Sequence, residues 1–145
     1  MINKPIVQKI VLAGVVFNAE GKALILQRNS NEDIYPDLWE LPSGKREPLE
    51  PSLDSLKREI MEEAGLDTEI VSAFSVFDYQ IEKTTEIRDS TQINFIVKSS
   101  NFDVRLSEEH QNFAWITRED LTHYQVSDET RKVILKAFDV ILKLT

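Results

Sequence analysis

The part of this sequence that could do chemistry is a group of three carboxylates, Glu59, Glu62 and Glu63. Apolar residues recur around them at steps of three and four, at Leu53, Leu56, Ile60 and Ala64. This spacing predicts an amphipathic helix with the three glutamates on one side, beside the apolar stripe. Like charges four residues apart destabilise an isolated helix. Because hard oxygen ligands at close range suit Mg²⁺ or Mn²⁺, the pattern predicts a divalent metal site.

These glutamates belong to a longer pattern that runs from Gly44 to Leu66. It reads glycine, five residues, glutamate, seven residues, and then Arg-Glu-Ile-Met-Glu-Glu-Ala-Gly-Leu. At average residue usage, a chance match to all the fixed positions has a probability on the order of 10⁻⁸. The pattern is the Nudix box, and through it the chain resembles a MutT-like Nudix hydrolase.

The resemblance implies an α/β fold, a Nudix-type α/β/α sandwich with a mixed β-sheet, and a single Nudix hydrolase domain over residues 1–145. It also implies a Mg²⁺ or Mn²⁺ cofactor, with Glu59, Glu62 and Glu63 as metal ligands and catalytic residues. Water would then cleave a phosphoanhydride in a nucleoside diphosphate linked to a second group. The substrate expected first is a nucleoside triphosphate, cleaved to the monophosphate and pyrophosphate.

The resemblance assigns cofactor-binding and supporting roles to residues around the helix. Arg58 would pair with acidic neighbours such as Glu50 and hold the loop against the helix. A main-chain carbonyl near Ser43 or Gly44 would complete the metal shell. Arg28, at the end of a predicted strand, either reaches a phosphate or is a surface charge.

A further catalytic glutamate is expected from the loop that precedes the late tryptophan, Trp115. Glu109 has the better spacing from this tryptophan, and Glu108 is the alternative. A charged surface turn is the competing interpretation of the same residues. The neighbouring His110 is expected to be an exposed loop residue and not a metal ligand.

Two residues of the box loop, Ser43 and Leu49, stand where many Nudix proteins have glycine. Both disfavour a positive φ, which glycine adopts without cost. Pro48 and Pro51 flank the second position and bias the segment towards extended backbone. We therefore expect an extended Leu49 and a reshaped diphosphate loop.

Runs rich in Val, Ile and aromatic residues, separated by turn residues, predict the strands that carry the box. The expected strands are 6–17, 23–28, 38–41, 69–81, 92–98 and 113–116. The first two are expected to form a hairpin around the turn at 18–21. The charged stretch 82–90 is expected to be a connection between two strands.

Helix boundaries follow from capping residues. The box helix is expected to begin near Pro51 or Ser52 and to end at Gly65, a left-handed cap. The sequence Thr117–Asp120 opens a short helix in the manner of a capping box. The last helix is expected to start at a Ser127 cap, to end near residue 144 and to bury one apolar face.

Composition limits the classes of function. The 145-residue chain has a net charge of −8 and no cysteine. The missing cysteines exclude disulfides, a Cys-ligated zinc and a catalytic thiol, and the negative charge argues against stable nucleic-acid binding. The N-terminus lacks a signal-peptide pattern and no apolar run has the length of a membrane span. We therefore expect a cytoplasmic monomer or homodimer that binds a small-molecule nucleotide.

Other functions of the same fold remain as alternatives. ADP-ribose hydrolases usually carry a proline shortly after the box, and this chain has none beyond Pro51. Tyr79 lies where dinucleoside polyphosphate hydrolases often have a tyrosine, but at a different offset. A diphosphate isomerase of this fold needs a cysteine. A non-catalytic nucleotide sensor usually loses box glutamates, and all three are present here.

Overall fold

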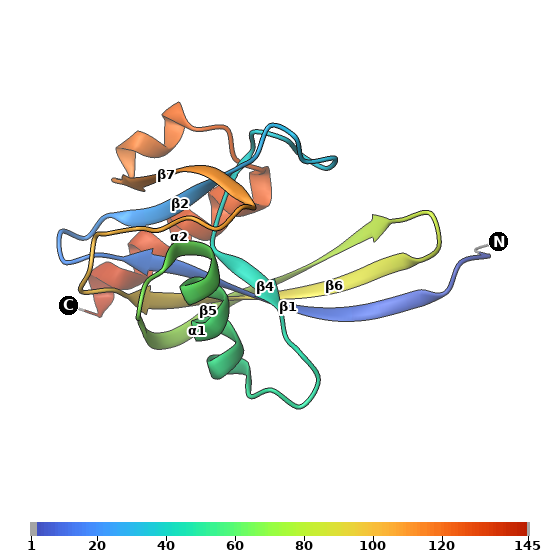
Figure 1. Cartoon of the computed structure of the whole chain (residues 1–145). Coiled ribbons are helices and arrows are strands. Elements are labelled where there is room, and N and C mark those ends of the chain that lie inside the picture. The colour runs from blue at the N-terminus through green and yellow to red at the C-terminus, as the bar shows by residue number, and fades with distance from the viewer. Residues whose placement is uncertain (1–2, 145) are drawn as a thin grey trace.

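One mixed β-sheet organises the molecule (Figure 1). The computed structural model describes residues 3–144, and within them seven strands form one sheet. The strands are β1 (Ile6–Phe17), β2 (Ala23–Arg28), β3 (Trp39–Glu40), β4 (Ser43–Lys45), β5 (Glu69–Glu82), β6 (Ile87–Lys98) and β7 (His110–Ile116). Their order is β3-β2-β1-β6-β5, with β4 paired to β1 and β7 to β2. The pairing of β1 with β6 is parallel and the others are antiparallel.

Two helices cover opposite faces of this sheet, α1 (Ser52–Ala64) on one side and α2 (Asp128–Lys143) on the other (Figure 1). The alternation of β1 decides which side chain meets which helix. Leu12 belongs to the buried cluster that contains residues of α1, and its neighbour Ala13 belongs to the cluster that contains residues of α2. The expected α/β/α sandwich with a mixed sheet is confirmed. In residues 3–144, no helix is both long and apolar enough for a membrane crossing.

The box helix has the expected limits. Pro51 is its N-cap, and Gly65 ends it in the left-handed region with a φ of 68° and an N–H bond to the carbonyl of Met61. Leu53 belongs to the predicted apolar stripe, but it is 50% exposed. The sheet covers only the later turns of the helix, where Leu56 and Ile60 are fully buried.

The C-terminal helices also begin where their capping residues predicted. Thr117 and Asp120 form a reciprocal pair of hydrogen bonds, in which the backbone N–H of each residue donates to the side chain of the other. The 3₁₀ helix η1 spans Glu119–His123. The hydroxyl of Ser127 accepts from the backbone N–H of Thr130 at the start of α2. Both caps satisfy N–H groups that a helix leaves without intrahelical partners.

Two strands begin earlier than predicted, β6 and β7, and β7 begins at His110 and not at residue 113. β6 begins at Ile87 and not at residue 92, because residues 87–91 pair with β1 on one side and β5 on the other. Such two-sided pairing satisfies the backbone of a polar segment whose own composition does not favour a strand. The β1–β2 hairpin is reduced to one pair of residues, Phe17 and Ala23, since β4 and β6 also pair with β1.

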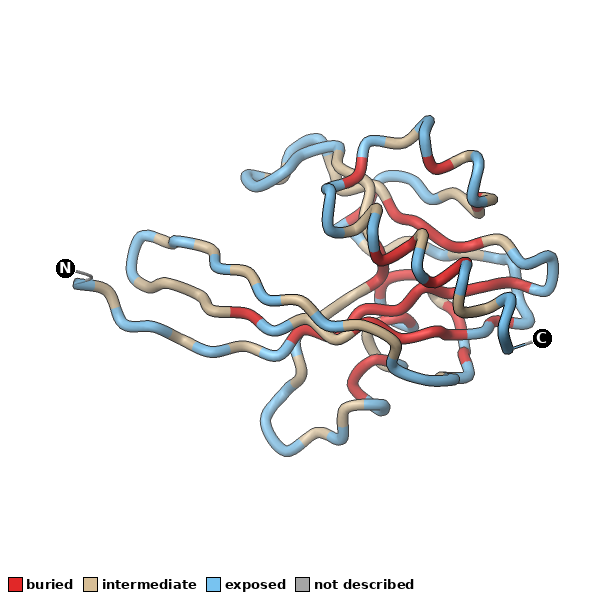
Figure 2. The backbone as a smooth tube through the Cα atoms, turned by 180° about the vertical axis from the view of Figure 1, so that it is seen from behind, coloured by how far each residue is buried: buried red, intermediate tan, exposed pale blue. Residues whose placement is uncertain are grey.

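Three strands extend beyond the two helices as a projecting arm (Figures 1 and 2). We define the arm as residues 6–11 of β1, 76–82 of β5 and 87–92 of β6, where β6 lies between the other two strands and pairs with both. Figure 2 shows that buried residues concentrate in the body and that the arm is mostly exposed or intermediate. The arm is not exposed throughout, since Ser90 is buried and Phe77 packs against the core cluster that contains residues of α2.

The expectation of an extended Leu49 was wrong. Its φ is 65°, in the left-handed region, and its side chain is 96% exposed. The backbone N–H of Glu50 bonds to the carbonyl of Glu47 at 3.1 Å, which closes a turn with Pro48 as its second residue. A turn with proline in second place and a positive φ in third place is of type II, and it favours glycine there. The loop therefore keeps a glycine geometry with a leucine in it.

Replacing Leu49 by glycine should stabilise the protein by about 1 kcal/mol, because glycine adopts this φ without the steric cost of a Cβ. We expect the melting temperature to rise by roughly 3 °C. Leu49→Ala is the matched control: it removes the exposed side chain but keeps the Cβ, so its melting temperature should stay near that of the unchanged protein. Equal melting temperatures for the two variants would contradict the strain argument.

Candidate functional site

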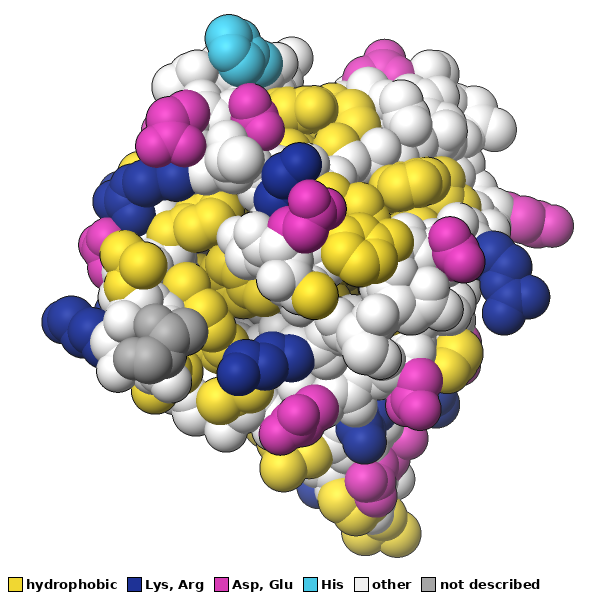
Figure 3. Space-filling model, turned by 90° about the vertical axis from the view of Figure 1, so that its left-hand side faces the viewer, with side chains coloured by type: hydrophobic (Ala, Val, Ile, Leu, Met, Phe, Trp, Pro, Cys, Tyr) yellow, Lys and Arg dark blue, Asp and Glu magenta, His cyan; other side chains and the backbone are white. Residues whose placement is uncertain are grey.

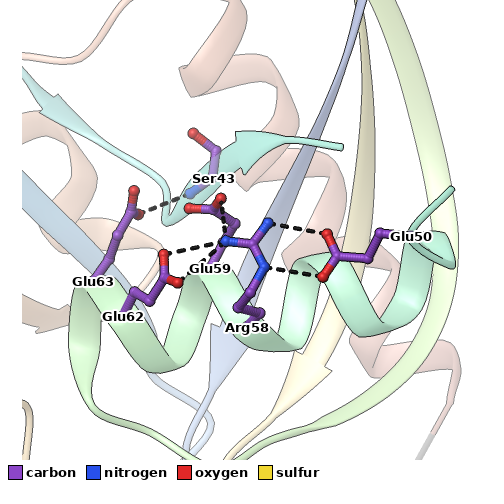
Figure 4. Close-up of polar contacts among 6 residues, drawn as sticks. All are labelled: Ser43, Glu50, Arg58, Glu59, Glu62 and Glu63. Carbon is purple, nitrogen blue, oxygen red and sulfur yellow. Dashed lines mark hydrogen bonds and ion pairs between the residues drawn. The ribbon is translucent and has the colours of Figure 1, made fainter. Parts of the chain in front are cut away.

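Arg58 is the centre of a carboxylate cluster on α1 (Figure 4). Its Nε and Nη2 atoms each donate to Glu50, at 3.0 Å, in a two-pronged pair. Its Nη1 atom donates to Glu59 at 3.0 Å and to both oxygens of Glu62 at 3.2 Å. The hydrogen bonds from Arg58 lower the pKa of Glu50, and the bonds to Glu50 and Glu62 raise the pKa of Arg58. Arg58 thus ties the type II turn to the helix.

Close contact between α1 and β4 requires a glycine at position 44. A Cβ placed on Gly44 would lie 2.1 Å from the carboxyl carbon of Glu59, which is less than any real contact allows. Burial raises the pKa of Glu59, and the charges of Glu62 and Glu109 add to this, while Arg58 acts in the opposite direction. The missing side chain of the glycine therefore admits a carboxylate to the edge of the sheet.

Glu63 is the most buried of the three helix carboxylates, with 7% of the residue exposed. Its Oε1 atom accepts a hydrogen bond of 3.0 Å from the backbone N–H of Ser43 (Figure 4). Desolvation raises the pKa of Glu63 to about 9, and the charges of Glu109, Glu40 and Glu59 contribute to the rise. Burial thus disfavours the charged form of Glu63, and a bound cation would favour that form.

Sequence reasoning missed two residues beside this cluster, Glu40 and His110. The Nε2 atom of His110 lies 2.8 Å from Oε2 of Glu40. The histidine was expected to be exposed in a loop, but it is 5% exposed and is the first residue of β7. Its burial results from the pairing of β7 with β2, which places His110 opposite Arg28. The only sequence signal for Glu40 was its charge, which is unusual within a short predicted strand such as 38–41.

The remaining candidates lie at the edge of the cluster. Arg28 has an Nη1 atom 3.5 Å from Glu40 and an Nη2 atom 3.5 Å from Glu32, so it faces the neighbouring loop. Glu109 is exposed, and its charge acts on both Glu59 and Glu63. The described residues give no sign that Glu108 joins them through its carboxylate; its main-chain carbonyl instead accepts from Asn29.

The donor set suits a hard divalent cation, although it is not arranged around one point. Among residues 3–144, no three acidic or histidine side chains converge as a preformed metal centre. Arg58 accounts for this, because it holds Glu59 and Glu62 by direct bonds. Carboxylate oxygens on one helical side, with the backbone of β4 beside them, remain the ligand type that Mg²⁺ or Mn²⁺ binds.

A cavity of the described chain lies away from these carboxylates. It has a volume of about 680 Å³ and is lined by Phe17, Lys57, Thr68, Lys98 and Ile141, among others. Figure 3 faces the side of the molecule opposite the arm, where apolar side chains gather between charged ones. None of the three helix carboxylates lines this cavity. The candidate chemistry therefore belongs to the α1–β4 edge and not to this cavity.

The burial of the Glu63 carboxyl group predicts that the free energy of unfolding depends on pH. A folded-state pKa of about 9 exceeds the unfolded value, so the stability from protonated Glu63 is present below about pH 4.5 and is lost as pH rises towards 9. In EDTA at about pH 8, Glu63→Gln should therefore melt roughly 3 °C or more above the unchanged protein. The gain should shrink towards about pH 5, and a gain that is independent of pH would refute the assignment.

Known proteins resemble this chain in sequence and in fold. The model of the NUDIX domain family matches residues 8–137. Nucleoside triphosphatase NudI from Escherichia coli O81 (strain ED1a) is 31% identical over 134 residues, which are 88% of this chain and 94% of that protein. The MutT protein from Methanosarcina mazei Go1 has a TM-score of 0.72 at 24% identity over 99% of both chains. A C. elegans Ap4A hydrolase has a TM-score of 0.71 at 25% identity, over 94% of this chain and 99% of its own. This chain therefore belongs to the Nudix hydrolase family.

Proposed function

We propose that this protein hydrolyses nucleoside triphosphates to monophosphates and pyrophosphate with Mg²⁺ or Mn²⁺, in the cytoplasm. The observation that carries the proposal is the set of Glu59, Glu62 and Glu63 on one side of α1, with burial raising the pKa of the first and the last. The similarity to nucleoside triphosphatase NudI supports the choice of a triphosphate substrate.

In this proposal the three glutamates of α1 hold the metal, and the main-chain carbonyl of Gly44 is the further ligand. When bound, a divalent metal neutralises charge on phosphoryl oxygens and lowers the pKa of water. Arg58 pairs with Glu59 and Glu62, two of the residues that would hold the metal, and its two-pronged pair with Glu50 keeps the loop in place.

In this proposal, acid–base catalysis is carried out by a carboxylate near the metal ligands. Glu109 is exposed and electrostatically coupled to Glu59 and Glu63, so it can take a proton from the attacking water and release it to solvent. The raised pKa of Glu63 keeps this acid protonated near neutral pH when no cation is bound, so Glu63 serves in this proposal as a metal ligand and not as the base. The glutamates of the site thus divide between ligand and base.

Glu62→Gln and Glu63→Gln should each lower kcat at least about 100-fold, as expected when a metal site loses a charged oxygen. Circular dichroism should show that both variants remain folded. Asp54→Asn, an acid in the first turn of the same helix, serves as the control and should keep nearly full activity. Near-normal turnover in both glutamate variants would remove the metal cluster from the mechanism.

The bond that is cleaved can be read from the products. With a panel of nucleoside triphosphates and Mg²⁺, we expect monophosphate and pyrophosphate by mass spectrometry. In water labelled with heavy oxygen, the label should enter a phosphoryl product, because water attacks phosphorus. Orthophosphate and a diphosphate as the only products would show a different choice of bond and would disprove the pyrophosphohydrolase assignment.

A further inference from the structure

The strand β5 has a long outer edge. It is the last strand in the sheet order, and β6 is the only described strand that pairs with it. On the arm, β5 is therefore the outermost of the three strands (Figure 1). In an antiparallel pair, every second residue directs its N–H and C=O groups away from the partner strand. An edge of this kind can bind a further strand through its main chain.

Only the first half of β5 has features that protect an edge against strand addition. Its pairing with β6 shifts twice, after Ile70 and after Ala73, and such bulges interrupt a regular edge. From Ser75 to Glu82 the pairing is regular. This segment contains no proline and no lysine, which are residues that often block an edge. The outer half of β5 is therefore the part that can accept a strand.

Apolar side chains follow one face of this outer half. Phe77, Tyr79 and Ile81 alternate along the strand and so share a face. This face is on the α2 side of the sheet, since Phe77 packs against the cluster that contains residues of α2. The rings of Phe77 and Tyr79 lie 5.7 Å apart. The register of the arm places Lys9 and Arg88 on the same face.

The other face of the same segment carries two acids. Val76, Asp78, Gln80 and Glu82 point to this face, which is on the α1 side of the sheet. Val76 is 63% exposed, so the sheet does not cover it. A strand that adds to this edge meets apolar side chains on one face and negative charge on the other.

Charge restricts how two copies of this edge can pair as antiparallel strands. A two-fold axis perpendicular to the sheet keeps each side chain on its own face, so odd-numbered residues meet odd-numbered ones. An axis at Asp78 sets this acid opposite its own copy, and an axis at Gln80 sets Asp78 opposite Glu82. Like charges directly opposite each other destabilise a sheet. Axes further along bring the bulges or the connection at 83–86 into the ladder. The register that remains has its axis at Tyr79.

With the axis at Tyr79, both faces of the edge pair without conflict. On the apolar face, Phe77 lies opposite Ile81 and Tyr79 lies opposite its own copy, and pairs of aromatic and β-branched residues stabilise neighbouring strands. On the other face no acid meets an acid. The pairs there are Asp78 with Gln80 and Glu82 with Val76.

We propose that residues 76–82 of β5 bind the same segment of a second copy of this chain as an antiparallel pair, with Tyr79 at the two-fold axis. The two arms then form one continuous sheet, and because each copy uses its edge once, assembly stops at a dimer. The strand β4 is separated from this edge by β1 and β6. The interface is therefore independent of the proposed hydrolase function.

The first test changes the sign of one charge. Val76→Glu sets two acids opposite each other at each end of the ladder, and it should raise the dissociation constant of the dimer by about fivefold. Val76→Lys should lower that constant by a similar factor, because it faces Glu82 of the second copy. Sedimentation over a range of concentrations measures both values. In a Glu82→Gln background the two variants should no longer differ.

The second test reads the register by cross-linking. The chain has no cysteine, so an introduced cysteine is the only thiol. Tyr79→Cys should form a disulfide between two copies on mild oxidation, since opposite Cα atoms lie roughly 4.5–5.5 Å apart. Val76→Cys is the matched control and should not cross-link to itself, because its two copies lie about 20 Å apart along the ladder. A mixture of the Val76→Cys and Glu82→Cys proteins should cross-link to each other.

Each outcome decides the proposal. Monomers at every soluble concentration, or assemblies that grow beyond the dimer, would overturn it. So would a dimer that ignores the sign of the charge at position 76, because its interface lies elsewhere. If Tyr79→Cys weakens pairing through its lost ring, the mixed cross-link between positions 76 and 82 still reports the register, and its failure in a dimer would exclude the axis at Tyr79. Circular dichroism should show that every variant remains folded.

Discussion

The structure of the candidate site depends on the close packing of α1 against β4. Glu59 occupies the space that a side chain at position 44 would fill, and Glu63 accepts the backbone N–H of Ser43. Both carboxylates are thereby withdrawn from water at the edge of the sheet. Burial disfavours the charged form of an acid. This one contact therefore raises the pKa of both carboxylates, and a bound cation would offset the cost of their burial.

Arg58 offsets part of the free-energy cost of ionising Glu59 in its buried position. Its guanidinium binds Glu50 with two parallel hydrogen bonds and uses its remaining nitrogen for Glu59 and Glu62. Planar two-pronged pairs of this kind fix geometry as well as charge. The same residue therefore holds the strained turn at Leu49 in place and keeps two carboxylates close together, while Glu63 lies outside its reach.

The long central strand β1 connects this edge to the rest of the molecule. It pairs with β2, β4 and β6, so the box loop, the second strand and the arm all take their positions from it. The strict alternation of side chains along paired strands then separates acids from bases on the arm. The α1 carboxylates and the basic residues of the arm thus lie on opposite faces of one sheet.

The sequence by itself determined the box helix, its end at Gly65, and the common side of its three glutamates, because these depend on residues within a few turns of one another. The caps at Thr117 and Ser127 were predictable for the same reason. The first strand was also predictable, since a run of β-branched residues favours a β-strand over other local structures.

Only the tertiary structure decided the features that depend on distant partners. The strand at residues 87–91 exists because two neighbours pair with it, and the burial of His110 beside Glu40 follows from pairing across the sheet. Leu49 adopts a positive φ because its turn must close and deliver Glu50 to Arg58. Local propensity predicts none of these, since the free energy that stabilises each one comes from contacts made elsewhere in the fold.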